Sequence, residues 1–99
     1  MPLALKWSYF DKGTVSREGD EYGVYELGNE YDILYIGEGH VYSRLMAHFP
    51  GGRDPIVGAS GYRVEYTGSK ARAEQRQNAE LAEYRRTHGR LPRFNGRRS

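Results

Sequence analysis

Residues 22–49 read YGVYELGNEYDILYIGEGHVYSRLMAHF, and this stretch decides the fold. Apolar and polar residues alternate over 23–27, which is typical of a strand, and a denser apolar run follows over 33–36. A short polar turn at 28–30 separates the two runs, so the pattern predicts an antiparallel hairpin.

A short amphipathic helix is predicted directly after the hairpin. Gly-Glu-Gly at 37–39 breaks the second strand, and apolar side chains then recur at helical spacing over 41–49. This stripe consists of Val41, Leu45, His48 and Phe49. Proline and glycine within 50–55 end the helix and open a loop.

The rest of the chain predicts one strand and one long helix. Residues 62–66 alternate cleanly and therefore predict a third strand of the same sheet. Ser69 is expected to cap a helix over 70–88, a segment without proline or glycine, and Gly89 is expected to end it. The predicted class is α+β, with a three-stranded antiparallel sheet flanked by helices in the order β-β-α-β-α.

Length and composition exclude several classes of protein. The 99 residues suit a single domain, and its small core must be rich in tyrosine, since nine Tyr accompany only 15 Leu, Ile and Val. Without cysteine, the chain has no disulfide, thiolate zinc site or cysteine nucleophile. No apolar run reaches the ~20 residues that span a bilayer, and no signal peptide is evident. We therefore expect a cytoplasmic protein that does not bind membranes.

Charge is distributed unevenly along the chain. Residues 1–50 carry four basic and eight acidic side chains, whereas residues 51–99 carry eleven basic and five acidic ones. Six arginines gather near the end: Arg85, Arg86, Arg90, Arg93, Arg97 and Arg98. This pattern predicts a polyanionic partner, most often nucleic acid, although a solvated helix and tail would carry the same charge.

Two tripeptides in the quoted stretch carry a family resemblance. Residues 23–25 read Gly-Val-Tyr and residues 35–37 read Tyr-Ile-Gly, followed by Arg44 and, near the end, by Asn95. In this order and spacing they resemble the motifs of the GIY-YIG nuclease superfamily, over residues 22–95. The resemblance implies hydrolysis of DNA phosphodiesters with a divalent metal, Mg²⁺ or Mn²⁺.

The resemblance also implies a set of catalytic residues. They are Tyr25, Tyr35, Arg44, His48 and Asn95. A fixed guanidinium suits the charge that builds on a phosphate during attack, and nearby positive charge would make a phenol a better base. Each residue also has a plainer interpretation: packed strand tyrosines, a surface arginine, a histidine at a helix end and a capping asparagine.

The segments outside the resemblance receive separate interpretations. Residues 1–21 form an N-terminal segment that could supply an extra strand or a lid over the domain. Residues 96–99 are interpreted as a basic tail.

The metal-ligand position departs from the family pattern. The family holds its metal through one glutamate on the long helix, and both the helix start at 69–73 and Leu81 place that position at Gln77. Helical spacing predicts one inward stripe with Gln77 at its centre: Ala73, Gln77, Leu81, Tyr84 and His88. An amide is a poor substitute for a carboxylate as a ligand of Mg²⁺. Three explanations remain open. The loss of the glutamate at position 77 is natural, or it is an introduced change of Glu to Gln. Alternatively another glutamate supplies the ligand, and Glu80 is a better candidate for this than Glu74.

Three functions remain open at this stage. The first is a DNA endonuclease-type domain, inactive or weakened by Gln77. The second is a non-catalytic module that binds DNA or RNA through the same scaffold and the basic C-terminal region. The third is a scaffold for a protein partner or for a second copy of the chain.

Overall fold

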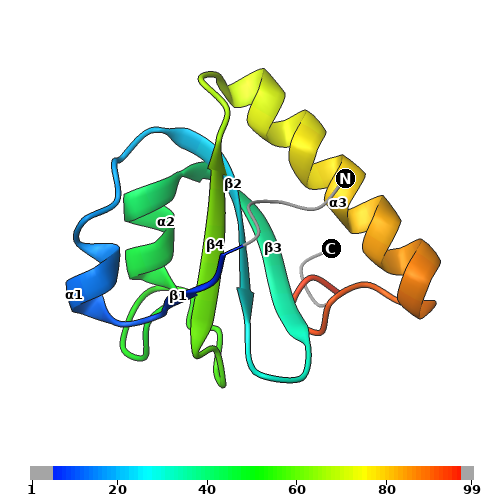
Figure 1. Ribbon diagram of the computed structural model, residues 1–99, viewed down its shortest axis with the longest axis horizontal. Helices are drawn as coiled ribbons and strands as arrows, with labels where there is room; N and C mark the ends of the chain where they lie inside the picture. Colours follow the sequence, from blue (N-terminus) through cyan, green and yellow to red (C-terminus); the bar gives the residue numbers. More distant parts are fainter. Residues whose placement is uncertain (1–5, 97–99) are drawn as a thin grey trace.

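The computed structural model describes residues 6–96 of the chain (Figure 1). Its elements, in chain order, are β1 (Ser8–Tyr9), α1 (Lys12–Val15), β2 (Tyr22–Gly28), β3 (Ile33–His40), α2 (Val41–Ala47), β4 (Gly61–Tyr66) and α3 (Lys70–His88). The predicted α+β class is confirmed, and so are the hairpin, the third strand and the long helix. Among residues 6–96, no helix is both long and apolar enough to cross a bilayer.

The sheet has four antiparallel strands in the order β1-β4-β2-β3, so the prediction of three strands is wrong by one. The additional strand, β1, pairs Ser8 with Tyr62 and Tyr9 with Gly61. Two residues are too few to show a periodic pattern, and only the free edge of β4 gives them a partner. Residues 6–21 therefore pack into the same body as the rest, with Val15 in its core.

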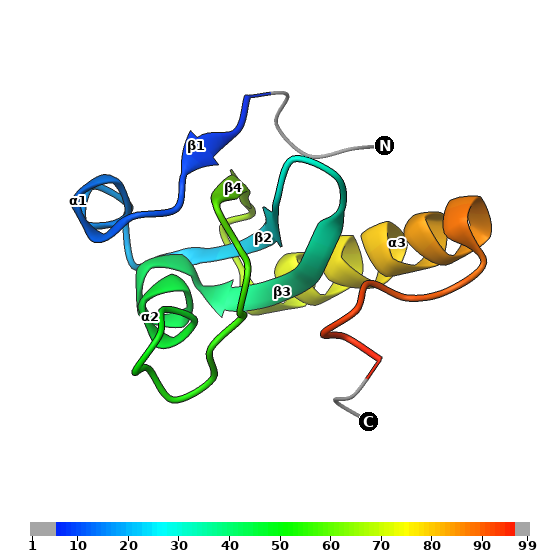
Figure 2. The same cartoon turned by 90° about the horizontal axis from the view of Figure 1, so that it is seen from below.

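Helices cover both faces of the sheet (Figures 1 and 2). Successive residues of a strand point to opposite faces, so β2 supplies Tyr25 and Leu27 to the side of α1 and α2. It supplies Val24 to the side of α3, where the apolar cluster is much smaller. The main core thus lies between the sheet and the two short helices.

Local signals set the ends of α3 and α2. The Ser69 side chain accepts a hydrogen bond from Arg72 N at 3.2 Å, and Gly89 ends α3 with a φ of 76°. Helix α2 ends at Ala47, two residues before the predicted end, because the chain turns toward the loop there. His48 and Phe49 nevertheless complete the predicted buried stripe.

The buried face of α3 differs from the predicted stripe in two residues. His88 is exposed, whereas Glu80, which the stripe left out, is buried together with Ala73 and Tyr84. A prediction from hydrophobic spacing assigns every glutamate to the surface. The Glu80 carboxylate, however, forms an ion pair with the Arg76 guanidinium one turn earlier, at 3.1 Å. A charge with its partner nearby can face the sheet.

Candidate active site

Four of the five predicted catalytic residues meet on the α2 side of the sheet. Tyr25 on β2 and Tyr35 on β3 have ring centroids 6.2 Å apart, and both rings contact His48 at the end of α2, at 5.6 and 5.1 Å. Arg44, one turn earlier on α2, hydrogen-bonds both phenols. The pairing of β2 with β3 brings the two tyrosines together, and the packing of α2 against these strands adds His48, which is 23 positions from Tyr25.

A directed chain of hydrogen bonds runs through this cluster. The Nδ1 atom of His48 lies 2.8 Å from the Asp54 carbonyl oxygen, which can only accept, so a neutral ring carries its proton on Nδ1. Nε2 then accepts the hydroxyl proton of Tyr25 across 2.6 Å. The Tyr25 oxygen is left to accept from Arg44, whose guanidinium has no acceptor atom.

Burial decides which of these groups a ligand can reach. Tyr25 and His48 are 0% exposed, whereas Arg44 lies at the surface. Arg44 lines an open pocket of about 520 Å³ together with Asp20, Glu38, His40, Ser43 and Lys70. Arg44 is thus the exposed member of the cluster, whereas Tyr25 and His48 are enclosed behind it.

The same burial opposes a phenolate at Tyr25. Desolvation raises the pKa of Tyr25 far above its ordinary value, the neighbouring Tyr35 raises it further, and Arg44 offsets only part of this shift. Partial burial by itself lowers the pKa of Arg44, but interactions with Tyr25 and Tyr35 raise it above its usual value. The cluster therefore contains a charged guanidinium beside the neutral phenol of Tyr25.

Gly37 explains how the phenols lie against β3. Gly37 pairs with Tyr25 in the register of β2 and β3. A Cβ atom at position 37 would lie 2.5 Å from the Tyr25 hydroxyl oxygen and 2.7 Å from the Tyr35 ring, closer than real Cβ atoms come to other atoms. The glycine of the second tripeptide is therefore required by the packing of the two tyrosines.

Asn95 and Gln77 meet on the outer edge of β3, at Ile36. The Asn95 side chain accepts from Ile36 N and donates to Ile36 O, both at 2.9 Å, as a neighbouring strand would do. The amide of Gln77 donates to the same carbonyl at 3.5 Å. The predicted metal-ligand position thus reaches the edge strand β3 from the α3 side of the sheet, and it carries an amide group there.

Glu80, the alternative metal ligand, lies in a different environment. On the α3 side of the sheet it faces Glu26, which is 1% exposed and is paired with Arg63 at 2.7 Å. Arg76 joins this group by bonding both Glu80 and Glu65. Sequence reasoning did not predict this network, although a glutamate between two buried strand residues, Tyr25 and Leu27, is a signal for one.

The described residues do not fit a Mg²⁺ or Mn²⁺ ion. Across residues 6–96, no group of three or more His, Asp or Glu side chains is placed to hold a metal. The tyrosine cluster offers two phenols and an imidazole beside the positive charge of Arg44, whereas these ions prefer charged oxygens. A carboxylate at position 77 would add a charged oxygen near Ile36.

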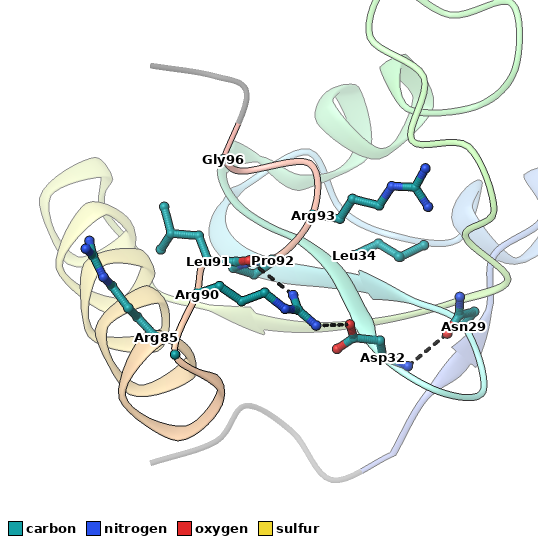
Figure 3. A pocket seen from close by; sticks show the side chains of 10 residues that line it. Asn29, Asp32, Leu34, Arg85, Arg90, Leu91, Pro92, Arg93 and Gly96 are labelled. Carbon is teal, nitrogen blue, oxygen red and sulfur yellow. Dashed lines mark hydrogen bonds and ion pairs between the residues drawn. The ribbon is translucent and has the colours of Figure 1, made fainter.

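Three of the predicted nucleic-acid-binding arginines line another pocket, of about 640 Å³, at the C-terminal end of α3. They are Arg85, Arg90 and Arg93, and Figure 3 shows Arg90 between the other two. Arg90 is anchored by Asp32 at 2.9 Å. Arg86 is exposed on α3, and Arg97 and Arg98 lie outside the described residues.

Comparison with known proteins places the chain in one family. No curated protein and no solved structure matches it. A family profile matches residues 1–87, which is most of the chain and includes every described helix and strand except the last residue of α3. The chain belongs to the family described as Domain of unknown function (DUF7508).

Proposed function

We propose that this chain is an endonuclease-type domain that binds a DNA phosphodiester at Arg44, Tyr35 and Asn95, with Gln77 at the position of the missing metal ligand. The observation that carries the proposal is the chain of hydrogen bonds from Asp54 through His48 and Tyr25 to Arg44. A surface arginine ordinarily samples many rotamers, and fixing one beside an open pocket suits the recognition of an anion.

The chain's own residues have distinct roles in this proposal. Arg44 contacts the phosphate oxygens, and the phenols of Tyr25 and Tyr35 hold its guanidinium in place. His48 keeps the Tyr25 proton directed at Nε2, which leaves the phenol oxygen free to accept from Arg44. Because the donor set does not suit a divalent metal, binding of the phosphodiester without its hydrolysis is expected for this sequence.

A plasmid and branched-DNA cleavage assay with Mg²⁺ or Mn²⁺ tests the proposal. It compares the chain as it stands with Gln77→Glu and with Gln77→Glu/Arg44→Ala. We expect cleavage to appear with Gln77→Glu and to fall by ~10²–10³-fold when Arg44 is also removed. Arg72→Ala in the Gln77→Glu background is the control, because Arg72 is exposed in the first turn of α3.

The other outcomes separate the alternatives. Cleavage by the unchanged chain that is lost with Arg44→Ala would place the metal on another carboxylate. If the double variant cleaves as fast as Gln77→Glu, the role of Arg44 is wrong. No cleavage by any form would contradict the endonuclease proposal.

A second candidate function is a non-catalytic module that binds nucleic acid. Gln77 and the arginines at the end of α3 favour it. Binding through phosphate contacts must weaken steeply as salt rises. If the chain binds DNA in this way while Gln77→Glu cleaves nothing, the second candidate replaces the first; salt-insensitive or absent binding would contradict it.

A further inference from the structure

A pocket lined by aromatic rings opens at the turn between β2 and β3, on the α3 side of the sheet. Its volume is about 250 Å³, and its rings come from distant parts of the chain: Trp7, Tyr31, Tyr84 and His88. Tyr31 at the tip of the turn is 88% exposed and Trp7 is 39% exposed. Large exposed aromatic side chains that gather around one hollow are typical of a binding site.

The Trp7 ring is held firmly in this pocket. Gly28 and Gly61, which pair across β2 and β4, leave a flat floor beneath the indole. A Cβ atom on either would lie 3.3 or 3.5 Å from a ring carbon. The Arg63 guanidinium lies 4.6 Å from the ring centroid. Trp7 is therefore a rigid aromatic surface, which can stack on a ligand with little loss of conformational entropy.

Tyr84 and His88, both on α3, also line the pocket and form a wall of it. Their rings stack at 4.1 Å with an angle of 26° between them. The Tyr84 hydroxyl donates to Asp32, which also accepts from Arg90. These bonds fix the wall to the turn between β2 and β3.

The aromatic pocket adjoins the arginine pocket of Figure 3. The two share Asn29 and Asp32 in their lining, so they form one continuous surface. The arginine pocket holds Arg85, Arg90 and Arg93 against a single carboxylate, Asp32. Its excess positive charge favours an anionic ligand, and the neighbouring rings favour one with a planar group.

We propose that this surface binds unpaired nucleotides, with a base stacked in the aromatic pocket and the adjoining phosphates along the three arginines. The inference deepens the proposed function, since it names single-stranded nucleic acid as the form that the domain recognises. Paired bases are buried in their own stack and expose no ring face, so a duplex cannot enter the aromatic pocket. Aromatic platforms beside a basic groove are the usual means of binding single strands.

The position of this surface fits a strand that continues to the candidate active site. The segment after α3 follows the outer edge of β3, where Phe94 N donates to Leu34 O and Asn95 brackets Ile36. Asp32 and Ile36 are four residues apart, which is ~13 Å along a strand. A single strand held at the turn can therefore reach the Asn95 side of the site.

Fluorescence of Trp7, the one tryptophan of the chain, tests the proposal directly. The full chain is titrated in EDTA with a dT12 oligonucleotide, and separately with a blunt duplex of twelve base pairs. We expect dT12 to quench Trp7 and to bind at least about tenfold more tightly than the duplex. Oligonucleotide rU12 provides the RNA arm of the same titration.

Two variants and two matched controls locate the binding. Tyr31→Ala should weaken binding of dT12 by about tenfold, as expected for the loss of one stacking ring. Arg85→Ala/Arg93→Ala should lower the slope of log affinity against log salt by about 0.7 for each phosphate that the variant no longer neutralises. Tyr9→Ala and Arg72→Ala are the controls, since both residues are exposed and line neither pocket.

The outcomes distinguish this inference from the proposed function. Quenching that Tyr31→Ala weakens and Tyr9→Ala does not supports the inference, even if Gln77→Glu never cleaves DNA. An equal or greater affinity for the duplex, an unchanged affinity of Tyr31→Ala, or no binding of either oligonucleotide would overturn it. In each of these cases the cleavage assay still decides the proposed function.

Discussion

At the scale of single residues, the site depends on a tyrosine that has no exposed surface. Tyr25 could have been a simple core residue, as strand tyrosines usually are. Instead its hydroxyl contacts His48 and Arg44, and this pair of contacts satisfies a polar group that burial would otherwise leave without a partner. Among the described residues, no buried side-chain nitrogen or oxygen lacks a hydrogen-bond partner.

Replacing this one hydroxyl tests the role of Tyr25 as a positioning residue. Tyr25→Phe keeps the ring in the core but leaves His48 Nε2 without its donor, so we expect a loss of ~1–3 kcal/mol in the free energy of unfolding. Arg44 also loses an acceptor, so DNA binding should weaken by more than the unfolded fraction explains. Urea unfolding and a DNA titration measure the two effects, with the exposed Tyr9→Phe as the control. Wild-type values for both would contradict the role.

At the scale of elements, α3 packs on the sheet through charges as much as through apolar side chains. The apolar cluster on this side has only three fully buried members, Val24, Ile36 and Tyr84. The space beside them is filled by Glu26 and Glu80 with their arginine partners. Burial raises the pKa of Glu26 above its ordinary value of 4.5; Arg63 opposes the rise and Glu80 adds to it.

This interface makes stability depend on pH. The pKa of Glu26 is higher in the folded than in the unfolded chain, so the folded chain holds this proton more tightly. The resulting contribution to the free energy of unfolding is complete at low pH and is lost as the pH rises through the folded-state pKa. Glu80→Gln removes the like charge and offers Glu26 a donor. We therefore expect the Tm of the unchanged chain to fall more between about pH 5 and about pH 8 than that of Glu80→Gln. Glu74→Gln, an exposed glutamate on the same helix, should follow the unchanged chain; equal slopes for all three would contradict the interpretation.

At the scale of the whole molecule, the last described segment closes the open edge of the sheet. Strand β3 is an edge strand, and an uncovered edge is a site for pairing with another chain. Phe94 and Asn95 occupy its outward backbone groups at Leu34 and Ile36. Asn95, which the sequence predicts as a site residue, thus protects the edge of the sheet through its two bonds to Ile36.

Removing the Asn95 side chain should therefore affect the whole sheet. In Asn95→Ala, we expect the Ile36 amide to lose its protection against hydrogen exchange and the chain to form dimers at high concentration. Hydrogen exchange by NMR and size-exclusion chromatography measure these effects. Asn78→Ala, on the exposed side of α3, is the control. A fully protected Ile36 amide in Asn95→Ala would show that Asn95 does not cover the edge.

The sequence determined those features that depend on local periodicity and local caps. Alternation over 23–27 and 62–66 determined two strands, and Ser69 and Gly89 determined the ends of α3, because a cap acts within one turn of its own helix. The resemblance groups Tyr25, Tyr35 and Arg44 in one site, and these three side chains lie together in the structure.

Only the tertiary structure decided what depends on partners far along the chain. The pairing of β1 with β4, the burial of Glu80 and the aromatic pocket around Trp7 each join segments that are distant in the sequence. No periodic pattern encodes such contacts. Whether a two-residue strand pairs, a glutamate is buried or a ring lines a pocket depends on which distant segment packs against it. The contact of Gln77 has the same origin: helical spacing predicts its place on the inward face of α3, but its hydrogen bond to Ile36 follows from the packing of α3 on the edge of the sheet.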